Sequence, residues 1–168
     1  MRKLKASDAQ AMFDNYTNDA RVTKFLSWTP HGDVSHTKAL LESWMPEYER
    51  DDYYHWGIVA EGRLIGSIST ITISEKNENC EVGYCIAYDD WGKGIVAEAL
   101  RKVMRFLFTE VGMHRIMAKH DTENPGSGRV MQKCGMTYEG TMKEYYKRHD
   151  GTFGDSNIYA ILRHEFLS

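Results

Sequence analysis

The sequence predicts an α/β (α+β) protein in which helices flank a mixed, mostly antiparallel and twisted sheet. Apolar residues recur at helical spacing in the first 50 residues, whereas residues 54–72 alternate with a period of two. A strand–helix–strand pattern follows over residues 81–120, and two long extended segments close the chain. The predicted order is therefore helices, three antiparallel strands, one βαβ unit, a short helix and a β-hairpin.

Length and composition indicate one globular domain covering residues 1–168. The formal net charge of −3 argues against broad nucleic-acid binding, because such binding needs a basic face. No apolar run approaches the roughly 20 residues of a membrane span, so we expect no membrane partner and a cytoplasmic location. The three cysteines, Cys80, Cys85 and Cys134, lack metal-ligand or disulfide spacing. We expect buried, inert thiols and no metal site.

Three helices are expected before residue 54. The first begins at Ser7 as its N-cap, and the second covers residues 19–26. The third is capped by Ser35 or Asp33 and ends at residues 51–52. Its predicted buried side consists of Leu40, Leu41, Trp44, Met45 and Tyr48.

The next segment alternates as strands do. Residues 54–60 and 64–72 form two arms joined by a turn at Glu61-Gly62. A third strand covers residues 81–86. This part of the chain therefore predicts three consecutive antiparallel strands.

Two glycines, Gly92 and Gly94, stand directly before a strong helix pattern. Apolar residues recur at helical spacing and predict a helix that ends near Gly112: Val96, Leu100, Val103, Leu107 and Val111. Glycine lets a backbone approach a ligand closely, and the first turn of a helix has free N–H groups at the positive end of its dipole. Lys93 adds a full positive charge at the same place. The stretch therefore predicts an anion site, with phosphate as the usual anion.

Two other interpretations of this stretch remain open from the glycines alone. Gly92-x-Gly94-x-x-Ala97 fits a dinucleotide-binding fingerprint, with Asp121 placed to bind a ribose. A glycine-rich turn with no ligand is the other. A dinucleotide domain needs repeated βαβ units and the chain has one, so we disfavour that alternative.

The last third of the chain predicts a strand, a helix and a hairpin. The strand covers residues 115–120, and the short helix from residue 124 to residue 134 ends at Gly135 as its C-cap. Two long strands, residues 137–148 and 153–162, follow with a turn between them.

Three motifs in this order resemble the GNAT superfamily of acyl-CoA-dependent N-acetyltransferases, in its ribosomal-protein (Rim-type) branch. They are Glu81-Val82-Gly83-Tyr84-Cys85-Ile86, then Trp91-Gly92-Lys93-Gly94 with Glu98-Ala99, then the stretch from Asn124 to Met136. The resemblance covers nearly the whole chain. It departs at residues 1–4, which retain only the end of the family's first strand, and at Val96, where the family prefers Gly or Ala.

The resemblance implies a sheet splayed at its centre, with acetyl-CoA between the strand ending at Ile86 and the strand over residues 115–120. No metal is implied. The pantetheine arm pairs with the backbone of residues 85–87, and the diphosphate binds the N–H groups of residues 92–97. The implied cofactor-binding residues are Cys85, Ile86, Ala87, Trp91, Gly92, Lys93, Gly94, Ile95, Val96, Ala97, Asn124, Ser127, Arg129 and Lys133.

Two residues are implied as catalytic. Ser127 protonates the leaving thiolate, and Glu81 is the candidate base, with water as the alternative. Each implied role has a structural alternative. Asn124 and Ser127 suit a helix start, Glu81 suits a surface ion pair, and Arg129 and Lys133 suit a solvated face. The acceptor pocket is expected to include the aromatic residues Trp28, His31, Tyr145 and Tyr146.

The function expected from the resemblance is transfer of an acetyl group from acetyl-CoA to a primary amine, such as a protein or peptide N-terminal α-amine. A polyamine, an amino acid or an aminoglycoside is the alternative acceptor. A non-catalytic CoA-binding sensor is the alternative activity. The expected partners are this amine acceptor and, in a homodimer, a second copy of the chain.

Overall fold

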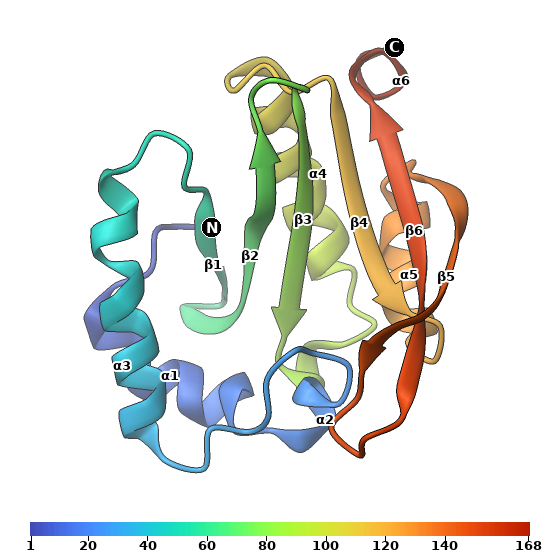
Figure 1. The fold of residues 1–168 in the computed structure, drawn as a ribbon. Helices are drawn as coiled ribbons and strands as arrows, with labels where there is room; N and C mark the ends of the chain where they lie inside the picture. Colours follow the sequence, from blue (N-terminus) through green and yellow to red (C-terminus); the bar gives the residue numbers. More distant parts are fainter. The chain divides into compact units, whose positions relative to one another are not determined.

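The computed structural model describes residues 1–168 as two compact units. Unit 1 comprises Met1–Ser69 and Tyr84–Lys93, and unit 2 comprises Thr70–Gly83 and Gly94–Ser168. Six strands are hydrogen-bonded in the order β1-β2-β3-β4-β6-β5 (Figure 1). Strands β3 and β4 pair in parallel, whereas β1 with β2, β4 with β6 and β5 with β6 pair antiparallel. The predicted mixed, mostly antiparallel sheet with flanking helices is confirmed.

Unit 1 contains the N-terminal helices and the first strand. Its regular elements are α1 (Ala9–Met12), α2 (Ala20–Thr23), α3 (Val34–Trp44) and β1 (His55–Ala60). The predicted first helix is broken, because a 3-10 turn precedes α1 and a π-helical turn follows it. Ser7 is not its N-cap. The carboxylate of Asp8 instead accepts the N–H of Lys5 at 2.8 Å.

Helix α3 begins as predicted but ends early. Of the two candidate caps, Asp33 is the one used, because its Oδ1 accepts the N–H of Ser35 at 2.7 Å. The helix ends at Trp44, and Pro46 starts a 3-10 turn over Pro46–Glu49. Of the five residues predicted to be buried, only Leu41 is fully buried; the others are half-buried.

The extreme N-terminus forms less strand than predicted. Arg2 makes a single antiparallel bridge with Gly57 of β1, with N···O distances of 2.8 and 3.2 Å. The side chain of Arg2 donates to both carboxylate oxygens of Asp8 at 2.7 Å. The start of the chain is therefore fastened by one bridge and one ion pair.

Strands β2 (Arg63–Ser74) and β3 (Asn79–Ile86) run through both units. The other elements of unit 2 are α4 (Ile95–Thr109), β4 (Arg115–Asp121), α5 (Pro125–Lys133), β5 (Thr137–Lys147), β6 (Phe153–Leu162) and α6 (Arg163–Leu167). Helix α4 buries Leu100, Val103, Met104 and Leu107, and Ile116 of β4 is equally buried. It ends three residues before Gly112, so Val111 lies outside it and is only half-buried. The short α6 was not predicted.

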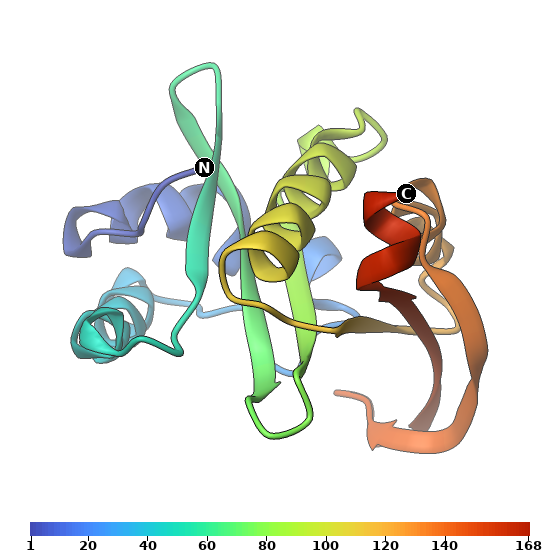
Figure 2. The same ribbon diagram turned by 90° about the horizontal axis from the view of Figure 1, so that it is seen from above.

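Strand β5 is strongly curved along its length (Figure 2). Its register with β6 shifts twice, and residues 143–145 lie opposite Asp155 alone, since Met142 pairs with Ser156 and Tyr146 with Gly154. Glu144 in this bulge has a φ of 47°, and its N–H donates to Asp155 Oδ1 at 2.8 Å. The bulge turns the following side chains toward β4.

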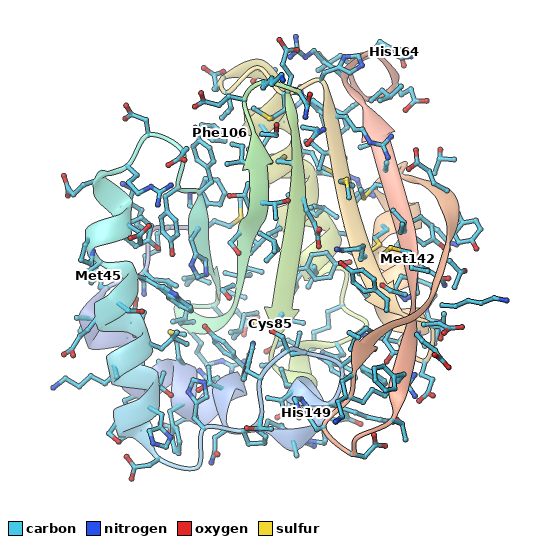
Figure 3. All side chains as sticks on the ribbon, in the orientation of Figure 1. Met45, Cys85, Phe106, Met142, His149 and His164 are labelled. Atoms are coloured by element: carbon cyan, nitrogen blue, oxygen red, sulfur yellow. The ribbon has the colours of Figure 1, made fainter.

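The three cysteines are free. Cys80 and Cys134 are buried as predicted, whereas Cys85, labelled near the end of β3 in Figure 3, keeps some exposed surface. No helix combines the length and hydropathy of a membrane span.

Candidate functional site

The end of β3 and the loop after it are fixed within unit 1. The N–H of Ala87 donates to Ile65 O at 2.7 Å, and the indole Nε1 of Trp91 donates to Ile86 O at 3.0 Å. A Cβ at Gly66 on β2 would collide with the carbonyl of Cys85, so only glycine allows this close approach of the two strands. Trp91 therefore holds the backbone turn, whatever further contact it makes with a ligand.

Cys85 is not a ready nucleophile. Its thiol lies 3.5 Å from the hydroxyl of Ser67, and burial raises the pKa of the Cys85 thiol. A thiol whose pKa is raised stays protonated at neutral pH. The family resemblance implies a role in ligand binding for the backbone of this strand end, not for the sulfur, and that role stays a prediction.

Asp90 organises the loop. Its carboxylate is 5% exposed, and it accepts Lys93 Nζ at 2.8 Å and Arg63 NH2 at 3.4 Å. The buried carboxylate of Asp90 is thus neutralised by two half-exposed cations. The sum of these three charges is positive, which suits an anion nearby.

Helix α4 begins with open backbone donors. Gly94 is its N-cap with a φ of 80°, and Gly92 in the loop has a φ of 77°. The first α-helical bond runs from Glu98 N to Gly94 O, so the N–H groups of residues 95–97 have no partner within the helix. A Cβ at Gly92 or Gly94 would meet no atom within 4 Å. Left-handed glycines, open space and free N–H groups fit a diphosphate.

The parallel pairing of β3 with β4 is short. It extends over three residues and ends with Glu81 opposite Met117. Strand β4 continues to Asp121, paired on its other side with β6, and β3 continues to Ile86. Pairing that stops in mid-strand is what a splayed sheet requires. The predicted opening for acetyl-CoA involves both units and stays a prediction.

Glu81 lies in an ion pair rather than alone. Its Oε2 is 2.9 Å from Lys119 Nζ, and the two side chains are 13% and 18% exposed. The ammonium also donates to Tyr145 Oη at 2.7 Å and lies 4.6 Å from the centre of that ring. Burial acts to lower the pKa of Lys119, but the bonds to Glu81 and Tyr145 outweigh it and raise that pKa. The ion pair expected as the alternative role of Glu81 is therefore present, and the role of Glu81 as the catalytic base stays a prediction.

The start of α5 uses Asn124 as its N-cap. Asn124 Oδ1 accepts the N–H of Ser127 at 3.3 Å, and Pro125 occupies the first helical position. Ser127 is half-buried, whereas Arg129 and Lys133 are exposed. The structural role predicted for Asn124 is confirmed, and its contact with pantetheine stays a prediction.

The residues expected in the acceptor pocket differ in their surroundings. Tyr145 projects from the β5 bulge and is 48% exposed. The hydroxyl of Tyr146 donates to Asp121, which Arg148 also binds with two nitrogens at 3.0 Å each. Tyr146 therefore anchors the hairpin in unit 2. In unit 1, Trp28 and His31 pack on each other with ring centres 5.3 Å apart.

Sequence reasoning missed Lys119 and His120. Lys119 is two residues from Met117, the partner of Glu81, so strand alternation could have placed it on the same face. His120 is buried, with Nδ1 2.7 Å from Asp121 O and Nε2 unpaired. A Cβ at Gly128 would come within 2.7 Å of that Nε2, which explains the glycine in α5. No pattern in the sequence indicates this contact.

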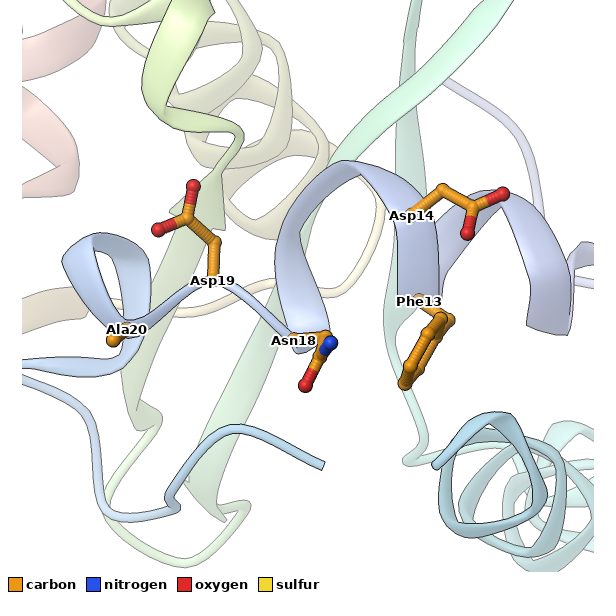
Figure 4. A pocket seen from close by; sticks show the side chains of 5 residues that line it. All are labelled: Phe13, Asp14, Asn18, Asp19 and Ala20. Atoms are coloured by element: carbon orange, nitrogen blue, oxygen red, sulfur yellow. The ribbon is translucent and has the colours of Figure 1, made fainter. Parts of the chain in front are cut away.

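A surface hollow in unit 1 is lined by Phe13, Asp14, Asn18, Asp19 and Ala20 (Figure 4). Its polar groups are engaged within the fold. Asp14 accepts Gln10 Nε2 at 2.8 Å, and Asp19 holds the guanidinium of Arg21. None of the predicted site residues lines it.

Comparison with known proteins decides the family. The model of the acetyltransferase (GNAT) domain matches residues 1–137. The chain belongs to the GNAT acetyltransferases. As a GNAT protein it is an N-acetyltransferase, and the family assignment made from the three motifs is confirmed.

Two curated GNAT relatives match along nearly the full length. The uncharacterized N-acetyltransferase YoaA of Bacillus subtilis is 28% identical over 165 residues, covering 97% of this chain and 92% of that protein. The [ribosomal protein uS5]-alanine N-acetyltransferase of Escherichia coli is 27% identical over 169 residues, covering 96% of this chain and 86% of that protein. The solved structure of a GNAT-family acetyltransferase from Bacillus anthracis matches with a TM-score of 0.83 at 27% identity, covering 97% of this chain and 93% of that one.

Proposed function

We propose that this GNAT enzyme transfers the acetyl group of acetyl-CoA to the α-amine of a protein or peptide N-terminus by direct attack in a ternary complex. The observation that carries the proposal is the left-handed Gly92 and Gly94 ahead of three unpaired helix N–H groups. That arrangement suits the diphosphate of CoA. The Escherichia coli relative, named for an alanine of ribosomal protein uS5, supports a protein acceptor.

The residues act as follows in this proposal. The backbone of residues 85–87 pairs with pantetheine, and the N–H of Cys85 or Ile86 stabilises the oxyanion that forms on the thioester carbonyl. The attacking amine forms the C–N bond and loses a proton to Glu81 or to water. The C–S bond then breaks, and the hydroxyl of Ser127 supplies a proton to the leaving thiolate.

The thiolate step needs little help. A coenzyme thiol with a pKa near the ~8.5 of cysteine is already a tolerable leaving group. We therefore expect Ser127 to contribute about tenfold to a hundredfold to the rate. Replacement by alanine would lower turnover by that factor without abolishing it.

Thiol release from acetyl-CoA tests the proposal. The protein is mixed with acetyl-CoA and with a free-N-terminal peptide, the same peptide blocked at its N-terminus, spermidine, a free amino acid or an aminoglycoside. Release with the free peptide and none with the blocked form is expected. Binding of CoA without release by any amine would contradict the enzyme and support a sensor. Stabilisation by NAD and not by CoA would contradict CoA as the ligand of the diphosphate site and favour the dinucleotide alternative.

A further inference from the structure

The ammonium of Lys119 has one donor left to offer. An ammonium carries three N–H donors, and the bonds to Glu81 and Tyr145 use two of them. Both partners hold the group in place, since Glu81 approaches from β3 and Tyr145 from the β5 bulge. The third donor of a fixed cation is free to receive a carbonyl oxygen.

Most carboxylates around this cation are engaged in ion pairs. Glu81 is matched by Lys119 itself, and Glu139 on β5 is matched by Arg115. Beyond β4, Asp121 and Glu123 both bind Arg148. The exposed Glu144 on the bulge follows the exposed Lys143, so the bulge adds no net charge. Because Asp121 and Glu123 share the single Arg148, and Asp155 bonds only to the N–H of Glu144, a small negative surplus remains around the hairpin. The carboxylate bonded to Lys119 itself is that of Glu81.

We propose, on the basis of the proposed function, that Lys119 determines the specificity for the acceptor. Its charge neutralises Glu81, and its third N–H holds the carbonyl oxygen next to an α-amine. A peptide N-terminus offers that oxygen close to its amine. A polyamine offers no acceptor atom and brings a second ammonium toward Lys119, which like-charge repulsion disfavours.

The test compares two probes, a free-N-terminal peptide without lysine and spermidine, in the thiol-release assay. Lys119→Glu removes the cation and adds a second carboxylate beside Glu81. It should lower kcat/KM for the peptide and raise it for spermidine, changing the peptide-to-spermidine ratio by about tenfold or more in spermidine's favour. Lys119→Met should give a peptide-to-spermidine ratio between those of wild type and Lys119→Glu. Lys119→Arg should keep the wild-type ratio, because it keeps the positive charge and the N–H donors.

Lys102→Met is the matched control. Lys102 makes a comparable 2.7 Å pair with Glu98, but on the exposed surface of α4. The ratio should be unchanged in this variant. Thermal unfolding of each variant checks the fold, and Lys119→Met carries the test if Lys119→Glu does not fold.

Three results would overturn the inference. Equal loss on both probes in Lys119→Glu and Lys119→Met would make Lys119 merely structural. Wild-type preference for spermidine would contradict its role directly. If the wild-type protein binds CoA but acetylates neither probe, the proposed function is contradicted, and the inference about Lys119, which rests on it, is contradicted as well.

Discussion

Replacing Gly94 by Asp or by Asn separates charge from backbone strain at the diphosphate site. Both residues have the same shape and tolerate a positive φ better than other side chains. Gly94 has a φ of 80°, and a Cβ there would enter open space. The two variants should therefore fold equally well and suffer the same strain. They differ in one carboxylate aimed at the place proposed for the diphosphate.

The size of the effect follows from Coulomb's law. A carboxylate about 5 Å from a diphosphate with two negative charges costs about 1.7 kcal/mol at the dielectric constant of water, and more at lower values. Gly94 is exposed, so solvent and salt screen the interaction. We expect a net penalty of about 1.4–3 kcal/mol, which weakens CoA binding about 10- to 150-fold in Gly94→Asp relative to Gly94→Asn.

Isothermal titration with CoA measures the difference directly. The titration is repeated with dephosphorylated pantetheine, which lacks the diphosphate and should bind both variants equally. Raising the salt concentration should narrow the gap between Asp and Asn. Equal CoA affinity in the two variants at low salt would refute the placement of the diphosphate at the start of α4.

Three further changes test other parts of the molecule. Asp90→Asn should raise the KM for acetyl-CoA about three- to tenfold, because Lys93 loses the partner that positions it. Asp89→Asn changes an exposed neighbour and should leave the KM unchanged. Equal effects of the two variants would contradict a role of Asp90 in positioning the loop. Glu81→Gln should lower turnover more at neutral than at high pH, and an equal loss at both would exclude it as the base. Burial lowers the pKa of His55 to about 4. On acidification, the His55 imidazole is protonated near pH 6.5 in the unfolded chain but only near pH 4 in the folded chain. The free energy of unfolding should therefore decrease as the pH is lowered from 6.5 to 4, by up to about 3 kcal/mol. A His55→Asn variant should lose that part of the pH dependence in denaturant titrations, and an unchanged profile would contradict it.

The fold was predictable where one local signal dominates. The glycine pair and the apolar spacing predicted α4, and the Asn124-Pro125 start predicted α5 within a residue. Failures occurred where tertiary contacts override local preference. Ser7 is a good cap by composition, but the ion pair of Asp8 with Arg2 organises that turn instead. The β5 bulge depends on Asp155 across the hairpin, which no local pattern reveals.

The candidate site was predictable as a set of backbone positions and less so as a set of side chains. Backbone N–H groups at a glycine-rich helix start follow from sequence alone. The partners of Glu81 and Asp90 do not, because each lies on another strand or at the far end of the loop. Trp91 is an example of a side-chain role that the sequence did not predict. Its indole N–H donates to Ile86 O and so holds the backbone turn, whereas the motif indicated only a contact with the cofactor.

The ion pair of Glu81 bears on the choice of acceptor. At pH 7, deprotonating an α-amine of pKa ~8 costs about 1.4 kcal/mol, whereas a lysine side chain of pKa ~10.4 costs about 4.6 kcal/mol. A carboxylate already bonded to Lys119 must share that contact before it accepts a proton. Water can meet the smaller cost, but the larger one calls for a dedicated base. We therefore expect an α-amine rather than a lysine or polyamine nitrogen as the acceptor. This comparison of pKa values adds to the charge argument for Lys119, and both depend on the same ion pair.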